Sequence, residues 1–176
     1  YTHSPILSEL QGVHSMDNAL FELAERLGQS LKAKGHKIAT AESCTGGWIA
    51  QAITEIPGSS AWFDRGFVTY SNNAKVQMLG VNPKTLEEYG AVSAEVAKQM
   101  AAGALANSEA DWAVAVTGIA GPDGGSEAKP VGTVYVAWQG KNGGVKVERL
   151  QLSGDRHQIR KQAVENAMEG VFDMLP

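Results

Sequence analysis

The sequence predicts an α/β fold: a three-layer sandwich with a mixed sheet of about five or six strands and helices on both faces. Short runs of β-branched and apolar residues alternate with longer segments of helical periodicity. One run, residues 112–116 (WAVAV), is apolar throughout, which is typical of a strand covered on both faces. Residues 131–138 and 145–152 flank a short Gly-rich turn, which predicts an antiparallel hairpin at the end of the sheet.

The first helix of this fold is predicted after an irregular leading segment. Residues 1–15 show no periodicity and precede Met16, so we expect a disordered leader or a cloning-derived extension. From Asp17 the pattern is helical, with Asp17 suited to the N-cap and Gly35 to the C-terminal stop. One face of this helix is apolar and carries Leu20, Leu23, Ala24, Leu27 and Leu31.

The remaining elements follow from local signals of strands, caps and breakers. Pro83 suits the first turn of a helix, and Ser93 suits the N-cap of the next one. In order, we expect a strand at 36–41, a helix at 48–56, a strand at 65–71, short helices at 73–79 and 83–88, a helix after Ser93, strands at 112–116, 131–138 and 145–152, and a last helix from Asp155.

Length and composition indicate one domain, expected over residues 16–176. The chain has 176 residues, of which 43% are hydrophobic and 19% charged, with a net charge of −4. This acidic balance lacks the basic surface of a nucleic-acid binder, and no apolar run approaches the roughly 20 residues of a membrane span. A single cysteine, Cys44, forbids an internal disulfide. We therefore expect a cytoplasmic protein without nucleic-acid or membrane partners.

The loop at residues 41–47 (AESCTGG) is the first candidate for chemistry. Ligands of α/β sheets bind beyond the C-terminal ends of the strands, where this loop is expected to lie. Ser43 is a candidate nucleophile, and Thr45, Gly46 and Gly47 could offer amides to an anion at the start of a helix. The alternative is that Ser43 or Thr45 only caps this helix and the glycines make a turn.

A lysine that follows a tyrosine by five residues is the second candidate. Lys75 could reach back to a hydroxyl near the strand end, and Tyr70 could relay a proton or fix the lysine. A lysine acts as a base near neutral pH only when its amine is partly desolvated. The alternative is a solvated lysine on a helix surface. Ser43 with Lys75 is the nucleophile system that the sequence favours.

Other nucleophile systems stay open at this point. A Ser-His-Asp triad would need His36 or His157, and His36 is expected at the opposite end of the sheet from Ser43. Cys44 could be the nucleophile of a cysteine-dependent amidase, although a lone cysteine beside a packed strand is commonly inert. One cysteine and two usable histidines are too few for a typical metal site.

A Gly-rich loop and an arginine complete the candidate residues. Residues 117–125 (TGIAGPDGG), which include Thr117 and Gly118, match neither a P-loop nor a dinucleotide-binding fingerprint. Such a loop either cradles a ligand or forms a long surface turn. Arg156 could clamp a phosphate or carboxylate from the start of the last helix, or pair with a neighbouring acid on the surface.

Several of these segments occur together in one known family. They are 41–47 (AESCTGG), 58–63 (GSSAWF), 66–71 (GFVTYS) with Asn72 and Lys75, 90–93 (GAVS), 117–122 (TGIAGP) with 123–126, 130–134 (PVGTV) and 154–156 (GDR). With these motifs, the chain from Asp17 onward resembles the CinA C-terminal domain family, which includes nicotinamide mononucleotide deamidases.

The resemblance implies an activity and a set of residues for it. The reaction would be hydrolysis of the carboxamide of nicotinamide mononucleotide, a pyridine nucleotide, to nicotinic acid mononucleotide and ammonia, without a metal or cofactor. Ser43, Tyr70 and Lys75 would form the catalytic group, in a homodimer or higher homo-oligomer. The substrate would be held by Thr45, Gly46, Gly47, Thr117, Gly118 and Arg156. The alternative is a catalytically silent relative that binds a pyridine nucleotide or has a regulatory role.

Overall fold

The computed structural model describes the chain from His3 to Pro176, with side chains described from Asn18 onward. Its elements are α1 (His3–Lys34), β1 (Ile38–Glu42), α2 (Trp48–Thr54), η1 (Ser59–Ala61), β2 (Phe63–Val68), α3 (Asn72–Leu79), α4 (Pro83–Tyr89), α5 (Ala94–Ala106), β3 (Trp112–Gly118), β4 (Thr133–Gly140), β5 (Val145–Gln151) and α6 (Arg156–Met174). The five strands form one sheet in the order β2-β1-β3-β4-β5.

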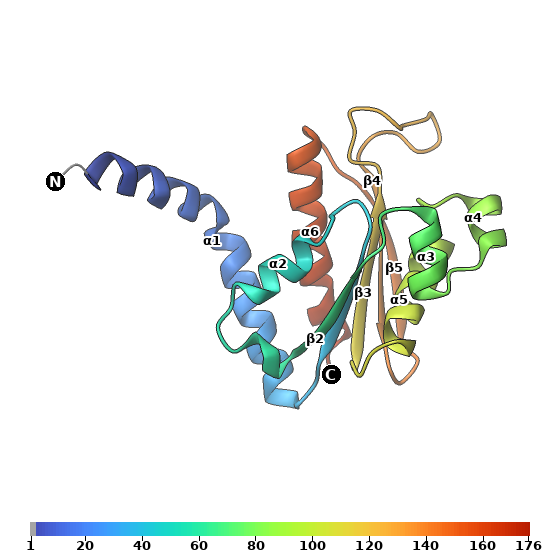
Figure 1. Ribbon diagram of the computed structural model, residues 1–176, viewed down its shortest axis with the longest axis horizontal. Helices are drawn as coiled ribbons and strands as arrows, with labels where there is room; N and C mark the ends of the chain where they lie inside the picture. The colour runs from blue at the N-terminus through green and yellow to red at the C-terminus, as the bar shows by residue number, and fades with distance from the viewer. Residues whose placement is uncertain (1–2) are drawn as a thin grey trace.

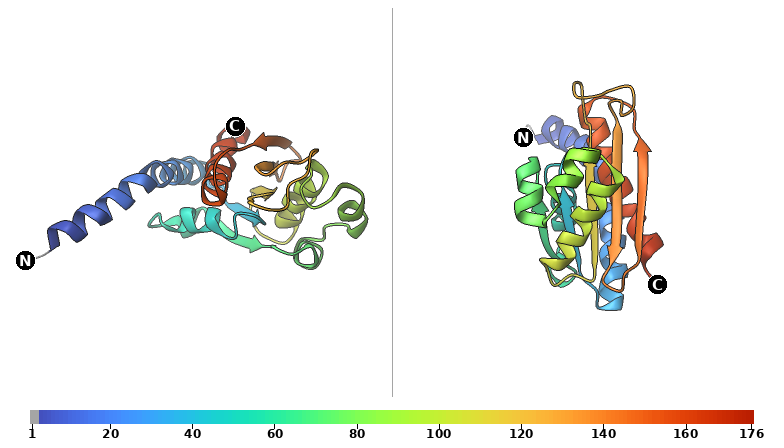
Figure 2. Two further views of the ribbon diagram at one scale, coloured as in Figure 1. Left: turned by 90° about the horizontal axis from the view of Figure 1, so that it is seen from above. Right: turned by 90° about the vertical axis from the view of Figure 1, so that its right-hand side faces the viewer.

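The sheet is mixed, as predicted. β1 pairs in parallel with both β2 and β3, whereas β4 and β5 are antiparallel additions at the other side of β3. α1, α2 and α6 cover one face of the sheet, and α3, α4 and α5 cover the other (Figures 1 and 2). The predicted three-layer α/β sandwich is therefore confirmed. No helix in the described part of the chain is long and apolar enough to cross a membrane.

β3 contributes to the cores on both faces, which explains its continuous apolar sequence. Val114 and Val116 pack into the core under α1, α2 and α6. Ala113 and Ala115, which point to the opposite face, pack into the core under α5. Neither face of this strand meets water, so polar alternation would be costly there.

The register of the three parallel strands brings their C-terminal ends to one edge. Glu42, the last residue of β1, is aligned with Val68 of β2 and with Val116 of β3. Just beyond this level, the Ser43 amide donates to the Val116 carbonyl at 3.0 Å, and the Thr69 amide donates to the Glu42 carbonyl at 2.8 Å. The loops that follow the three strands therefore start side by side.

Two predicted boundaries differ from the structure in instructive ways. The second strand was expected over 65–71, but β2 ends at Val68 because Ser71 caps α3, its hydroxyl accepting from the Ala74 amide at 3.0 Å. α1 begins at His3, so Asp17 lies inside this helix and not at its N-cap. The expectation of a leader over 1–15 stays a prediction, since side chains before Asn18 lie outside the described residues.

Candidate active site

Ser43 and Lys75 meet at the C-terminal edge of the sheet. Lys75 Nζ donates a hydrogen bond to Ser43 Oγ at 2.9 Å. Ser43 directly follows β1, and Lys75 lies in the first turn of α3, the helix that follows β2. Ser43 is 8% exposed and Lys75 only 1%. The structure thus brings together the two side chains that the sequence singled out as nucleophile and base.

The environment of Lys75 favours its neutral amine. Its second hydrogen bond goes to the main-chain carbonyl of Tyr70 at 3.1 Å, and it has no ion pair with a carboxylate among the described residues. Burial lowers the pKa of Lys75, because removal from water penalises the ammonium form. A lysine in this state can accept the proton of a neighbouring hydroxyl closer to neutral pH than a solvated lysine can.

Tyr70 contributes to the site differently from expectation. Its carbonyl fixes Lys75, but its side chain is 62% exposed and the structure shows no contact between its hydroxyl and the lysine. The hydroxyl instead accepts a hydrogen bond from Arg156 Nη2 at 3.2 Å. The main chain of Tyr70 thus fixes the lysine, one of the two roles expected for this residue, and a proton relay through its ring stays a prediction.

A pocket of about 290 Å³ opens over the Ser43–Lys75 pair, close to the usual size range of small-molecule sites. Thr117, Gly118 and Arg156 line it as expected, together with Tyr70 and most of the loop at 117–124. Gly118 must lack a side chain, because a Cβ there would lie 2.6 Å from Val134 Cγ2. The Gly-rich loop is thus part of a pocket wall rather than a turn remote from it.

Thr45, Gly46 and Gly47, which were expected to help hold a substrate, are not among the described residues that line this pocket. The Thr45 hydroxyl is buried and donates to Glu42 Oε1 at 2.7 Å. Gly47 has a left-handed backbone with φ of 102° and precedes α2 without any side-chain cap of its own. These three residues shape the turn after Ser43, and the structure gives none of them a place in the pocket wall.

Glu42 explains why the start of α2 is not free for an anion, and sequence reasoning missed it. Its buried carboxylate accepts hydrogen bonds from the Ile49 amide at 2.8 Å and the Ala50 amide at 3.1 Å, besides that from the Thr45 hydroxyl. A carboxylate at a helix N-terminus satisfies the unpaired amides and the helix dipole. The signal for this role was an acid at the end of a buried strand, before a helix that lacks a capping side chain.

Replacing Glu42 by glutamine should destabilise the fold. The amide keeps the size of the side chain but removes a buried charge that three donors require, so we expect a loss of about 2–4 kcal/mol in the free energy of unfolding. Urea unfolding measures this loss. Glu55→Gln is the matched control, an exposed glutamate after the same helix whose carboxylate accepts a hydrogen bond from the Gln51 side-chain amide. Equal stability of the two variants would contradict the assigned role.

Cys44 is unsuited to nucleophilic attack. It is buried, and burial raises the pKa of its thiol to about 12. The thiol is therefore protonated near neutral pH, whereas the thiolate is the reactive form. This environment argues against the cysteine-dependent amidase among the alternatives.

The two candidate histidines also lie away from the Ser43–Lys75 pair. His36 accepts a hydrogen bond from Trp112 Nε1 at 3.0 Å, at the start of β3, and so lies at the opposite edge of the sheet. His157 stacks on Trp48 with ring centroids 5.0 Å apart. Neither residue lines the pocket, so the triad alternative has no histidine in place among the described side chains. Among the described residues, no group of three or more His, Cys, Asp or Glu is arranged to hold a metal ion.

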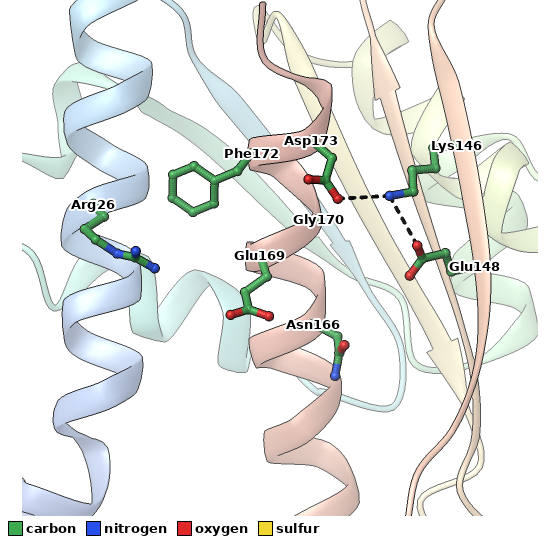
Figure 3. A pocket seen from close by; sticks show the side chains of 8 residues that line it. All are labelled: Arg26, Lys146, Glu148, Asn166, Glu169, Gly170, Phe172 and Asp173. Atoms are coloured by element: carbon green, nitrogen blue, oxygen red, sulfur yellow. Dashed lines mark hydrogen bonds and ion pairs between the residues drawn. The ribbon is translucent and has the colours of Figure 1, made fainter.

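A second, larger pocket of about 410 Å³ lies between α1, α6 and β5 (Figure 3). It lacks a nucleophile paired with a base, such as Ser43 with Lys75. Lys146 is held by Asp173 at 3.1 Å and by Glu148 at 3.2 Å, and the Arg26 guanidinium lies 5.5 Å from the centre of the Phe172 ring. None of the described residues in its wall is a serine, threonine or cysteine. The pocket over Ser43 is therefore the candidate active site.

Comparison with known proteins agrees with this architecture. The family model described as the CinA C-terminal domain matches residues 20–175. The chain belongs to this family. A member from Escherichia coli K12, named nicotinamide-nucleotide amidohydrolase PncC, is 56% identical over 159 residues, which cover 90% of this chain and 96% of that protein. A relative of the same name from Enterobacter agglomerans is 59% identical over 147 residues, covering 84% and 90%.

Solved structures of CinA family proteins have the same fold. The crystal structure of the competence/damage inducible protein CihA from Agrobacterium tumefaciens superposes with a TM-score of 0.87 at 51% identity, and the match covers 88% of this chain and 94% of that one. The curated relatives of similar length carry the name of an enzyme, an amidohydrolase. The pocket over Ser43 and Lys75 thus belongs to a fold shared with named hydrolases.

Proposed function

We propose that this chain hydrolyses the carboxamide of nicotinamide mononucleotide to nicotinic acid mononucleotide and ammonia. The observation that carries the proposal is the 2.9 Å hydrogen bond between Lys75 Nζ and Ser43 Oγ within a pocket. This pair fits amide hydrolysis, which needs an activated nucleophile and an acid for the departing amine. The choice of substrate is supported by relatives at 54–59% identity that are named nicotinamide-nucleotide amidohydrolase.

In this proposal Lys75 transfers one proton in each half of the reaction. Neutral Lys75 takes the proton of Ser43 while Ser43 Oγ bonds to the carboxamide carbon, whose carbonyl electrons move to the oxygen. The lysine then gives this proton to the nitrogen as the C–N bond breaks, which releases ammonia and leaves an ester on Ser43. Lys75 next deprotonates water, which attacks the ester, and returns the proton to Ser43.

The turn after Ser43 offers main-chain donors for the oxyanion. Its backbone hydrogen bonds are donated by the amides of Ser43, Gly46 and Trp48. The amides of Cys44 and Thr45 have no such bond to a main-chain carbonyl in the described part of the chain. Only Cys44 of these two residues lines the pocket, so we assign the oxyanion to its amide, and a well-placed donor of this kind lowers the barrier by about 3 kcal/mol.

Arg156 is the best-placed cation for the phosphate of a mononucleotide. It lines the pocket, with Nη1 donating to the Gly121 carbonyl at 2.7 Å and Nη2 to the Tyr70 hydroxyl. These two bonds orient the planar guanidinium, and an oriented guanidinium binds phosphate with geometric specificity. The proposal therefore places the phosphate near Arg156 and the carboxamide at Ser43.

Product analysis tests the function directly. The purified protein is incubated with nicotinamide mononucleotide, and both ammonia and nicotinic acid mononucleotide are quantified in equal amounts if the proposal is correct. Free nicotinamide, which lacks the phosphate, serves as the comparison substrate and should turn over far more slowly. Tight binding of the nucleotide without any product would instead favour the catalytically silent binding protein.

A further inference from the structure

Arg160 holds the turn after Ser43 from a distant part of the chain. Its Nε donates to the Cys44 carbonyl at 3.0 Å and its Nη2 to the Thr45 carbonyl at 3.2 Å. Arg160 lies on α6, more than a hundred residues away in sequence, and does not line the pocket. Arg160 therefore binds the turn after Ser43 through two main-chain carbonyls.

Aromatic stacking fixes the guanidinium in this position. It lies 5.5 Å from the centre of the Trp48 ring, at the first residue of α2. Gly46 lies directly beside the guanidinium and has a φ of +60°, a left-handed backbone that favours glycine. The planar fork of an arginine can hold two adjacent carbonyls while it stacks on a ring, which the single ammonium of a lysine cannot do.

Peptide geometry links these carbonyls to the amides that follow them. The peptide bonds of the turn are trans, so each carbonyl points opposite to the N–H of the same peptide unit. Fixing the Cys44 carbonyl toward Arg160 therefore directs the Thr45 amide away from Arg160. Fixing the Thr45 carbonyl likewise directs the Gly46 amide, which donates to the Ser43 carbonyl at 3.0 Å.

We propose that Arg160 is a positioning residue for the Cys44 amide, a main-chain donor to the oxyanion in the pocket wall. By holding the Thr45 carbonyl, Arg160 fixes the Gly46 amide on the Ser43 carbonyl, and this carbonyl belongs to the same peptide unit as the Cys44 N–H. A charged hydrogen bond to a carbonyl draws electron density toward that oxygen and makes the N–H of the same peptide a stronger donor. Arg160 thus acts on the transition state without touching the substrate. The inference rests on the proposed function for its kinetic consequence, but its effect on the turn is independent of any substrate.

Substitution of Arg160 tests the kinetic consequence and the effect on the turn. In Arg160→Met we expect kcat for nicotinamide mononucleotide to fall by about 10²-fold with KM changed by less than about threefold, because only the transition state loses a donor. Arg160→Lys, which can reach one carbonyl at most, should retain an intermediate kcat. Arg26→Met is the matched control, since it also removes an arginine stacked on an aromatic ring but lies in the second pocket.

Amide hydrogen exchange, measured residue by residue, separates the two proposals. In Arg160→Met the Gly46 amide should exchange at least about tenfold faster than in the wild type, whereas amides in the middle of α6 stay protected. Unchanged Gly46 exchange, or a raised KM at unchanged kcat, would overturn the role of Arg160. If Gly46 exchanges faster in Arg160→Met but the wild type does not hydrolyse the nucleotide, the positioning of the turn by Arg160 stands and the proposed function is rejected. Should the methionine variant not fold, the lysine variant gives the same readouts.

Discussion

Ser43→Ala is expected to lower kcat for nicotinamide mononucleotide by about 10⁴-fold or more, because the reaction loses its nucleophile and no neighbouring group replaces it. Cys44 cannot substitute for it while burial keeps the thiol protonated. Ammonia release under saturating substrate measures the effect. Adding hydroxylamine to the wild type should yield the hydroxamate of the product, since an ester on Ser43 would be captured by this stronger nucleophile.

A second buried serine provides the control for this experiment. Ser59 is 8% exposed, like Ser43, but lies in η1 before the start of β2, at the opposite end of the sheet. Ser59→Ala should keep kcat within about twofold of the wild type, because it touches no reacting atom. Activity of Ser43→Ala comparable to that of Ser59→Ala would remove the serine mechanism. If Ser43→Ala loses activity but the wild type forms no hydroxamate, the ester intermediate is rejected.

Lys75→Met and Lys75→Arg should each lower kcat/KM by about 10³-fold, within the usual range for loss of a general base. Arginine keeps the positive charge but is not deprotonated in proteins, so it separates proton transfer from simple charge stabilisation. Full activity of the arginine variant would show that Lys75 acts as a cation. Lys98→Met, an exposed lysine on α5, is the control for the loss of one surface charge and should match the wild type.

The pH dependence of the wild type should report the same lysine. Lys75 must be neutral to accept the Ser43 proton, so kcat/KM should rise with pH and level off above the pKa of Lys75 in the free enzyme. Because burial lowers this pKa, the rise should occur below 10.5, the ordinary value for lysine. A rate that falls as pH increases across this range would contradict the role of the lysine as base.

The order and type of the elements could be predicted because their signals are local. The apolar stripe from Leu20 to Leu31, the run at 112–116 and the turn before Val145 each specify their element within a few residues. Boundaries were less predictable. Residues 69–71 have the β-branched and aromatic composition of a strand, but the capping bond of Ser71 to the Ala74 amide ends the strand earlier. β1, the partner of β2, also ends at this level, because Glu42 is its last residue and is aligned with Val68.

The sequence by itself determined the α/β class, the family, and Ser43 with Lys75 as the candidate reactive pair. These depend on residue type, periodicity and position after a strand, which are properties of short segments. Tertiary structure decided three further contacts. The Tyr70 carbonyl accepts a hydrogen bond from Lys75, the Glu42 carboxylate accepts one from an amide at the start of α2, and Arg160 donates to a carbonyl of the turn after Ser43. Each of these is a hydrogen bond between groups that are brought together by the direction of a loop or by the packing of a distant helix. The donor–acceptor distance is therefore fixed only when the sheet and its helices pack together.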